Sequence, residues 1–296
     1  MPNARVTNYL HLHLLVLIAG FTAILGELIT IGSVPLVWYR MIIAAVFMFM
    51  YIKLRKVSLK HSPKTIAKFA FAGILIALHW ITFFESIKQA NISIALALFS
   101  TGAFFASLIE PLFYKRKIIW YEIVFGVVVI FGVWLITKTE FRYVNGILLG
   151  IASALFSTLF AVINGKFVEH YRASAISYYE FISGIICITI FLALSDGFTP
   201  DIFNLPTSDM VYLFILGSIC TAYAFIAAVY VMKLISPYTV VLTYNLEPIY
   251  GIILALIIFP EKEQMSTEFY IGAALIISTV VLNGIVKNSA KTKNIM

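Results

Sequence analysis

The sequence predicts an all-α polytopic membrane protein, in which ten transmembrane helices form two inverted five-helix repeats around a central cavity. Three observations lead to this fold class. Hydrophobic residues make up 61% of the 296 residues and charged residues only 12%, about half the charged fraction of a soluble domain. Apolar runs of about 20 residues, enough to cross a bilayer, recur along the whole chain. The two halves of the chain also align with each other.

Each apolar run is expected to be a helix, because backbone polar groups in lipid must be satisfied internally. Short turns such as 32–35 and 88–93 separate the runs, and one long acidic loop covers 196–209. The first run is longer than a signal-peptide core and is followed by no cleavage site, so it is expected to be retained. The expected spans are 11–31, 35–54, 66–88, 91–114, 118–137, 144–168, 174–194, 209–234, 237–259 and 267–287.

The basic residues predict the orientation of these spans. Sixteen of the 21 Lys and Arg residues fall in segments on the same side as the N-terminus, four fall on the other side, and Arg40 lies inside a span. Cytoplasmic loops carry the excess of basic residues, so both termini are expected in the cytoplasm, most simply of a bacterial inner membrane. The same reasoning ascribes the net positive charge to membrane orientation and not to nucleic-acid binding.

An internal repeat divides the chain into domains 1–140 and 141–296. Residues 101–126 align without a gap with 247–272, at a shift of 146 positions; 86–89 align with 231–234 at 145, and 38–41 with 178–181 at 140. Five spans per half is an odd number, so the halves are expected to run in opposite directions. Inverted repeats are typical of secondary transporters, which bind substrate near the bilayer midplane between the halves.

With these features the sequence resembles the ten-helix EamA branch of the drug/metabolite transporter superfamily. The resemblance is carried by Arg40 in WYRMIIAA and by SPYTVVLTYNLEPIYGIILALIIFPE at 236–261. It implies a central cavity lined by the first, third and fourth spans of each half. A proline would be expected where Gly102 stands, so the first half departs from the family pattern.

Glu247 and Pro248 are the leading candidates for a functional site. Glu247 lies about ten residues, or about 15 Å, into its span, close to the bilayer centre. A charge at that depth costs at least ~2.5 kcal/mol, so it is expected to face a cavity, find a partner or carry a proton. Pro248 interrupts the helix, and Gly102 is expected to loosen the aligned position. The alternative is an interhelical hydrogen bond with a packing kink.

Other polar and aromatic residues share helix faces with these positions. Thr243 and Tyr244 lie on the Glu247 face, and Thr101 and Phe105 hold matching positions in the first half. His79 is either a proton relay or a neutral hydrogen-bonding residue. The remaining candidates are expected either to line a pocket or to make hydrogen bonds and contacts between helices. They are Trp80, Ser153, Ser157, Asn164, Tyr223 and Tyr230.

Further charged residues are interpreted as structural. Arg40 is expected to snorkel or to pair with Glu27 across a short turn. Glu180 lies in the second turn of its span, where the positive N-terminus of the helix is expected to stabilise its negative charge. Cys187 and Cys220 lie within apolar spans and are expected to pack in the core, and no cluster predicts a metal site or a cofactor.

These patterns favour a secondary active transporter that moves a small metabolite or drug-like solute by alternating access, with proton or exchange coupling. Export is favoured over uptake because the family that the chain resembles includes many exporters. One alternative is a membrane-embedded enzyme acting on a lipid or isoprenoid, but the five histidines are scattered. A structural or receptor role is a third possibility, against which the lack of a sizeable soluble domain argues. The expected partners are the solute, protons and the lipid bilayer; the sequence does not predict an oligomeric state.

Overall fold

The computed structural model is all-helical over the residues it describes, which are 2–115, 117, 119–231, 235, 240 and 243–293. Side chains are described for these residues except 2–5, 229 and 287–293. Nine helical segments within the described part are long and apolar enough to cross a membrane, and the shorter apolar helix Glu247–Ile258 adds to them. The all-α polytopic class expected from hydropathy is confirmed. The junction of the eighth and ninth expected spans, with Lys233, and also Arg116, lie outside the described residues.

Elements of the first half are, in chain order, α1 (Pro2–Leu28), α2 (Ser33–Leu54), α3 (Pro63–Gln89), α4 (Ile92–Phe99), α5 (Gly102–Tyr114) and α6 (Trp120–Thr139). Those of the second half are η1 (Phe141–Tyr143), α7 (Val144–Phe167), α8 (Ala173–Leu194), α9 (Pro200–Phe203), α10 (Thr207–Gly217), the π-helix η2 (Ser218–Tyr223), α11 (Ala224–Val231), α13 (Glu247–Ile258) and α14 (Thr267–Lys293).

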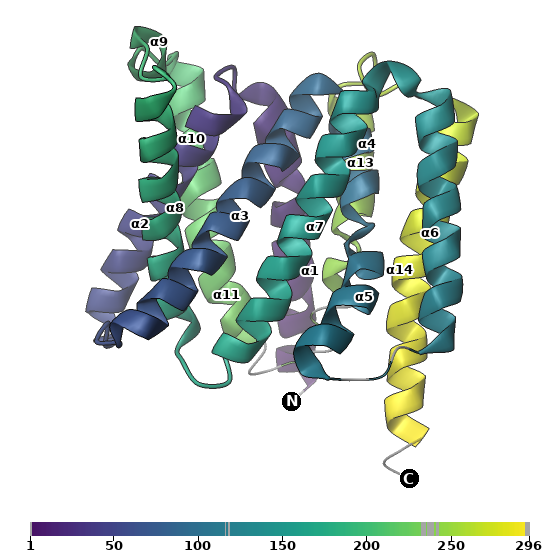
Figure 1. Ribbon diagram of the computed structural model, residues 1–296, viewed down its shortest axis with the longest axis horizontal. Helices are drawn as coiled ribbons and strands as arrows, with labels where there is room; N and C mark the ends of the chain where they lie inside the picture. Colours follow the sequence, from purple (N-terminus) through teal and green to yellow (C-terminus); the bar gives the residue numbers. More distant parts are fainter. Residues whose placement is uncertain are drawn as a thin grey trace.

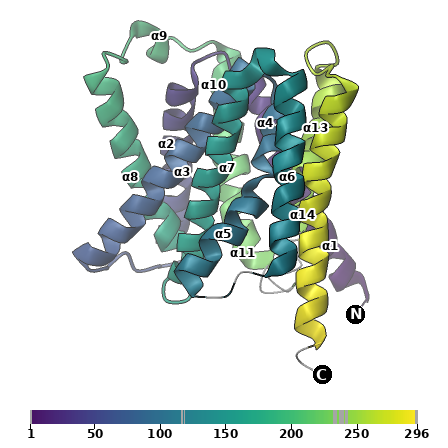
Figure 2. The ribbon, with the colours of Figure 1, turned by 45° about the vertical axis from the view of Figure 1, so that its right-hand side comes forward.

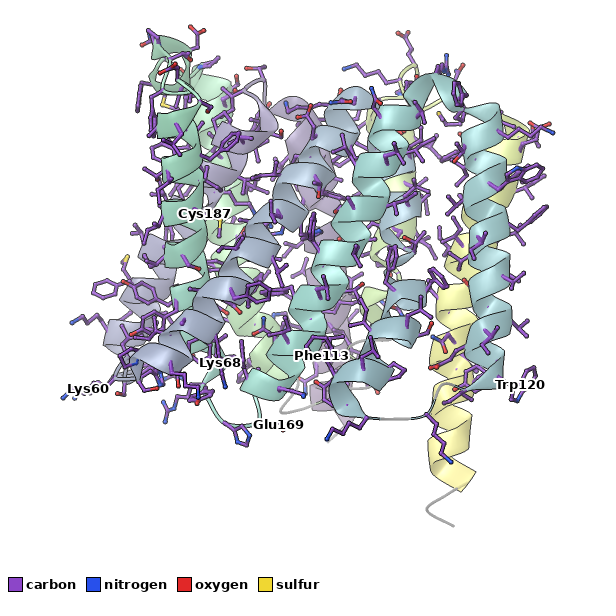
Figure 3. The ribbon with its side chains drawn as sticks, in the orientation of Figure 1. Lys60, Lys68, Phe113, Trp120, Glu169 and Cys187 are labelled. Atoms are coloured by element: carbon purple, nitrogen blue, oxygen red, sulfur yellow. The ribbon has the colours of Figure 1, made fainter. Side chains whose placement is uncertain are left out.

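The two halves run through the bundle in opposite directions. In Figure 1, α1 begins at the lower end and rises, whereas α7, the first long helix of the second half, begins at the upper end and descends. The end at which α1 begins and α14 approaches the C-terminus also carries Lys60, Lys68 and Glu169 (Figure 3), and we refer to it as the inner end. The opposite end is the outer end.

Helix starts follow local sequence signals. Pro63 occupies the first turn of α3, where its missing N–H costs nothing, and the Ser62 hydroxyl accepts from Thr65 N at 3.2 Å. The Asn91 side chain caps α4 by accepting from Ile94 N at 2.9 Å. These caps fix where the long apolar helices begin.

The most extensive helix packing is between the two halves. α3 lies on α7 and α8, α2 lies on α8, α1 lies on α13, and α6 lies beside α14 (Figure 2). At the α1–α13 contact a Cβ on Gly20 would lie 2.9 Å from the backbone nitrogen of Gly251. At the α6–α14 contact a Cβ on Gly132 would lie 2.9 Å from the carbonyl oxygen of Gly272. Only glycine permits such close approach of two helix backbones.

Candidate functional site

A cavity of about 800 Å³ lies between the two halves and opens at the inner end. Basic residues of the inner-end loops, Arg55, Lys56 and Arg172, stand at its mouth, and Glu180 lies deeper. The remaining lining residues come from α2 and the loop after it, α7, α8 and α11; they are Met48, Tyr51, Leu54, Val57, Phe160, Asn164, Val168, Ala173, Ser174, Ile176, Ser177, Phe225 and Ile226. The volume suits a small organic molecule.

The lining differs from the one that the family resemblance implied. α7 and α11 contribute as expected, and α2 and α8 contribute in addition. None of the described residues of the first, third, fourth and ninth expected spans lines this cavity. The reason is aromatic packing above it: the ring centroids of Phe181 and Phe225 are 5.5 Å apart, and Trp80 lies 6.1 and 6.4 Å from them. This cluster closes the space beyond the cavity.

Glu180 and Asn164 form a hydrogen-bonded polar pair in the cavity wall. Glu180 is only 1% exposed. Asn164 Nδ2 donates to Glu180 Oε1 at 2.7 Å and also contacts the Phe160 carbonyl oxygen at 3.3 Å. The interpretation of Glu180 as a helix-terminus residue missed its place in the cavity. Its alignment with Arg40 was the available signal, because two opposite charges inside aligned apolar helices are unusual.

Arg40 neither snorkels nor pairs with Glu27. It is 4% exposed, its guanidinium lies over the Trp80 ring with Cζ 3.8 Å from the centroid, and Nε donates to Thr221 Oγ1 at 2.8 Å. Glu27 instead meets Lys262 at 2.6 Å. The pairing expected from the sequence is therefore wrong: Arg40 lies about two turns inside α2, where it meets the aromatic core before it can reach the surface.

The helix interruptions lie at aligned positions of the two halves. α4 ends at Phe99 and α5 begins at Gly102, while α13 begins at Glu247 with Pro248 as its second residue. The Glu247 carboxyl interacts electrostatically with Arg40. Of the neighbouring candidates, Thr243 is buried and Tyr244 packs against the apolar cluster that contains Leu12, Leu15 and Val240. Each half thus has a discontinuous helix near mid-bundle, as transporters with inverted repeats have.

His79 is held by α7. Its Nδ1 lies 2.8 Å from Ser153 Oγ and 3.1 Å from the Ser153 carbonyl oxygen, and its ring stacks on Phe99 at 5.2 Å. Its burial and these bonds match the hydrogen-bonding alternative left open by the sequence. The relay alternative would require further polar groups beside the ring.

The other candidate residues are dispersed. Thr101 Oγ1 donates to the Leu98 carbonyl at 2.7 Å, and Phe105 packs against Phe104. Ser157 is half-buried on α7. Tyr223 and Tyr230 are 42% and 54% exposed, and the Tyr223 hydroxyl lies 2.8 Å from His11 Nε2. Asn164 lies in the cavity wall and Trp80 lies at its closed end. Thr101, Phe105, Ser157, Tyr223 and Tyr230 do not line the cavity.

The outer end is closed by buried carboxylates. Asp209 Oδ2, at the start of α10, accepts from Thr30 N at 3.0 Å, Thr30 Oγ1 at 2.8 Å and Ile31 N at 3.3 Å. Glu263 accepts from Ile92 N at 3.0 Å and Ser93 N at 2.9 Å, at the start of α4. Both contacts join the first half to the second. The outer end is therefore closed by bonds between the halves, whereas a cavity opens at the inner end.

No group of three or more His, Cys, Asp and Glu residues able to hold a metal occurs in the part of the chain that the structure describes. The candidate site consists of the cavity with Glu180 and Asn164 in its wall, the aromatic cluster with Trp80, and Arg40 and Glu247 on the far side of that cluster.

A helical membrane protein with two inverted halves, broken helices and a cavity open at one end has the architecture of a transporter. The EamA-like transporter family matches the chain twice, over residues 8–138 and 144–285, and the chain belongs to this family. Family membership places it among the membrane transporters of the drug/metabolite transporter superfamily. No curated protein matches the sequence. A solved structure described only as "Crystal structure of protein" has the same fold, with a TM-score of 0.63 and 16% identity over 94% of this chain and 97% of that one.

Proposed function

We propose that the protein is a secondary active transporter that exports a small metabolite or drug-like solute by alternating access, coupled to protons or to exchange. The carrying observation is the cavity of about 800 Å³ between the halves, open at the inner end while buried carboxylates tie the outer end. The excess of basic residues at the inner end supports a cytoplasmic location for this end and for both termini, with a bacterial inner membrane as the simplest site. A cytoplasmic cavity is where an exporter would load its solute.

The moving units in this proposal are the halves 1–140 and 141–296. Their interruptions at Gly102 and Pro248 give each half a discontinuous helix near mid-bundle, where bending requires the fewest helix hydrogen bonds to break. Thr243, Tyr244, Thr101 and Phe105 lie next to these interruptions and are assigned to the transport path with them. His79, Ser157, Tyr223 and Tyr230 are retained as weaker candidates for the same path.

Proton coupling is assigned to Glu247. Its carboxyl lies at a helix interruption and shares an electrostatic environment with Arg40, so gaining or losing a proton changes the charge balance between the halves. Glu180 is the competing carrier, because it lines the cavity and protons reach it from the inner end.

The test is transport by the full-length protein in proteoliposomes. Thermal-shift screening against metabolite classes identifies a ligand, and counterflow of that ligand followed by solute-driven pH change then measures transport and coupling. We expect Glu247→Gln to retain counterflow exchange and lose the solute-driven pH change, with Glu180→Gln as the matched comparison. An unchanged pH response in Glu247→Gln would contradict its assignment, and absence of counterflow in the unmodified protein would contradict transport itself.

A further inference from the structure

The Arg40 guanidinium has an unused hydrogen-bond donor. Trp80 covers its face and Thr221 accepts from Nε, but Nη1 is buried and has no hydrogen-bond partner among the described residues. No carboxylate in the described part of the chain lies within salt-bridge distance of it. A buried charge with an unpaired donor is costly, and the Thr221 hydrogen bond, the cation–π contact and the electrostatic interaction with Glu247 offset only part of that cost. Such a group can readily donate a hydrogen bond to an anionic ligand.

The repeat connects Arg40 with the open cavity. Arg40 aligns with Glu180, and each is the eighth residue of its helix, since α2 begins at Ser33 and α8 at Ala173. The two helices pack together and run in opposite directions. Arg40 therefore lies about 10 Å from the outer end of α2, as Glu180 lies about 10 Å from the inner end of α8. The two charges occupy equivalent depths on opposite sides.

Their aromatic neighbours are equivalent as well. The shift of 145 positions that aligns 86–89 with 231–234 places Trp80 on Phe225. Phe225 and Glu180 line the inner cavity, whereas Trp80 and Arg40 are packed beyond it. When inverted repeats rock, each half takes up the arrangement that the other had before. Opening the outer end thus places Arg40 and Trp80 in the wall of an outer cavity.

We propose that Arg40, stacked on Trp80, is an anion subsite that binds a carboxylate of the transported solute when the outer end opens; this rests on the proposed alternating access. A carboxylate is favoured over a phosphate because a single guanidinium balances at most one negative charge and already interacts with Glu247, whereas a phosphate monoester carries nearly two charges. Glu180 in the inner cavity supplies the opposite charge, so the solute meets a cationic group on one side and an acidic group on the other.

The subsite is tested by equilibrium binding to purified full-length protein in nanodiscs, which requires no transport. Three probes with one skeleton are compared by thermal shift: 3-phenylpropionate, 3-phenylpropan-1-ol and 3-phenylpropylamine. We expect only the carboxylate to raise the Tm through Arg40, with at least a tenfold loss of its affinity in Arg40→Gln. Arg40→Lys keeps the charge and is expected to retain part of the affinity. Arg142→Gln, in the exposed segment between α6 and α7 and outside the cavity, is the matched control and is expected to bind normally.

Three outcomes would overturn the subsite: no carboxylate effect in the unmodified protein, an equal effect of the alcohol, or an equal loss in Arg142→Gln and Arg40→Gln. Binding is measured separately from counterflow, so a protein that binds 3-phenylpropionate through Arg40 but transports nothing would contradict the proposed function and not the subsite.

The sidedness is tested with a native cysteine. Cys220 is 6% exposed, precedes Thr221 and interacts electrostatically with Arg40. After Cys187→Ser it is the sole cysteine of the chain. We expect a membrane-impermeant maleimide to label Cys220 from the outer side of intact vesicles. Labelling from the inner side alone, or from neither side, would contradict exposure of this region when the outer end opens.

Discussion

The outer and inner ends of the bundle are held in different ways. At the outer end, Asp209 and Glu263 accept hydrogen bonds from backbone groups of the opposite half. At the inner end, Asn164 and Glu180 bond to each other within the second half beside the cavity. The bonds that cross between the halves there come from neutral hydroxyls: Tyr179 Oη donates to the Leu59 carbonyl oxygen at 2.6 Å, and Tyr114 Oη to the Val162 carbonyl oxygen at 3.0 Å. Contacts that cross between the halves restrain rocking at both ends, and hydrogen bonds to a carboxylate, as at the outer end, are stronger than those between neutral groups. The bonds of Asp209 and Glu263 are therefore expected to limit the opening of the outer end.

The largest effect is expected from Asp209→Ala. The substitution removes the acceptor of three hydrogen bonds to Thr30 and Ile31 and leaves two backbone N–H groups unpaired. A loss of about 3 kcal/mol, equivalent to about 100-fold in the equilibrium between closed and open outer ends, is expected. Maleimide labelling of Cys220 from outside measures it, in the Cys187→Ser background. Asp201→Ala, in the exposed segment just before α10, is the control; equal labelling of the two variants would show that Asp209 does not hold this end.

Glu263→Ala is expected to have the next largest effect. Its carboxylate accepts from Ile92 N and Ser93 N at the positive N-terminus of α4, and removing it costs about 2 kcal/mol. The same labelling assay should show a smaller increase than for Asp209→Ala, together with a lower Tm. Glu261→Ala, two residues away and exposed, should leave both unchanged. A change of similar size in Glu261→Ala would mean that loop charge, not the bond to α4, is responsible.

Asn164→Ala tests the inner end. It removes the donor to Glu180 Oε1, worth about 1.5 kcal/mol, and should slow counterflow about tenfold by freeing the carboxyl from its position. Because this bond lies within one half, labelling of Cys220 from outside should not change. Asn204→Ala, on the exposed outer loop, is the matched control. An increase in outer labelling in Asn164→Ala would contradict the division into tied and open ends.

The smallest effect is expected from Lys262→Ala. Lys262 and Glu27 join the halves at 2.6 Å, but the Lys262 side chain is 66% exposed. Exposed ion pairs contribute below about 1 kcal/mol and are screened by salt. The Tm at low salt should fall slightly and the difference should vanish at high salt. A decrease in Tm that is independent of salt and as large as that of Glu263→Ala would contradict this, and would show that the Lys262–Glu27 pair holds the outer end as strongly as Glu263 does.

The sequence predicted the helices well because hydropathy and helix length are local properties. The spans, their separation by short turns and the repeat that aligns Gly102 with Pro248 all follow from residue order. Tertiary pairing does not. The wrong pairing of Arg40 with Glu27 rested on chain proximity, whereas Lys262, more than 200 residues away, meets Glu27. The π-helix Ser218–Tyr223 could not be seen in the hydropathy, because it lies inside one continuous apolar span, Thr207–Ala228.

The cavity was also only partly predictable. Asn164 was identified from a polar stripe, but Glu180 was assigned to a helix terminus because its depth alone could not distinguish a cap from a cavity wall. The position of Asp209 was read as part of an acidic loop. Its partners, Thr30 and Ile31, belong to the other half and leave no pattern in the residues around it.

The glycine contacts between α1 and α13 and between α6 and α14 have a mechanical consequence. At Gly20–Gly251 and Gly132–Gly272 the backbones of two helices from opposite halves touch, and the side chains of Leu96, Ile136 and Ile276 pack onto these glycines. Both places therefore set how closely the two halves can approach each other. A larger side chain at either place would wedge the halves apart at a distance from the cavity, and so would change the exchange between open and closed ends without touching the solute.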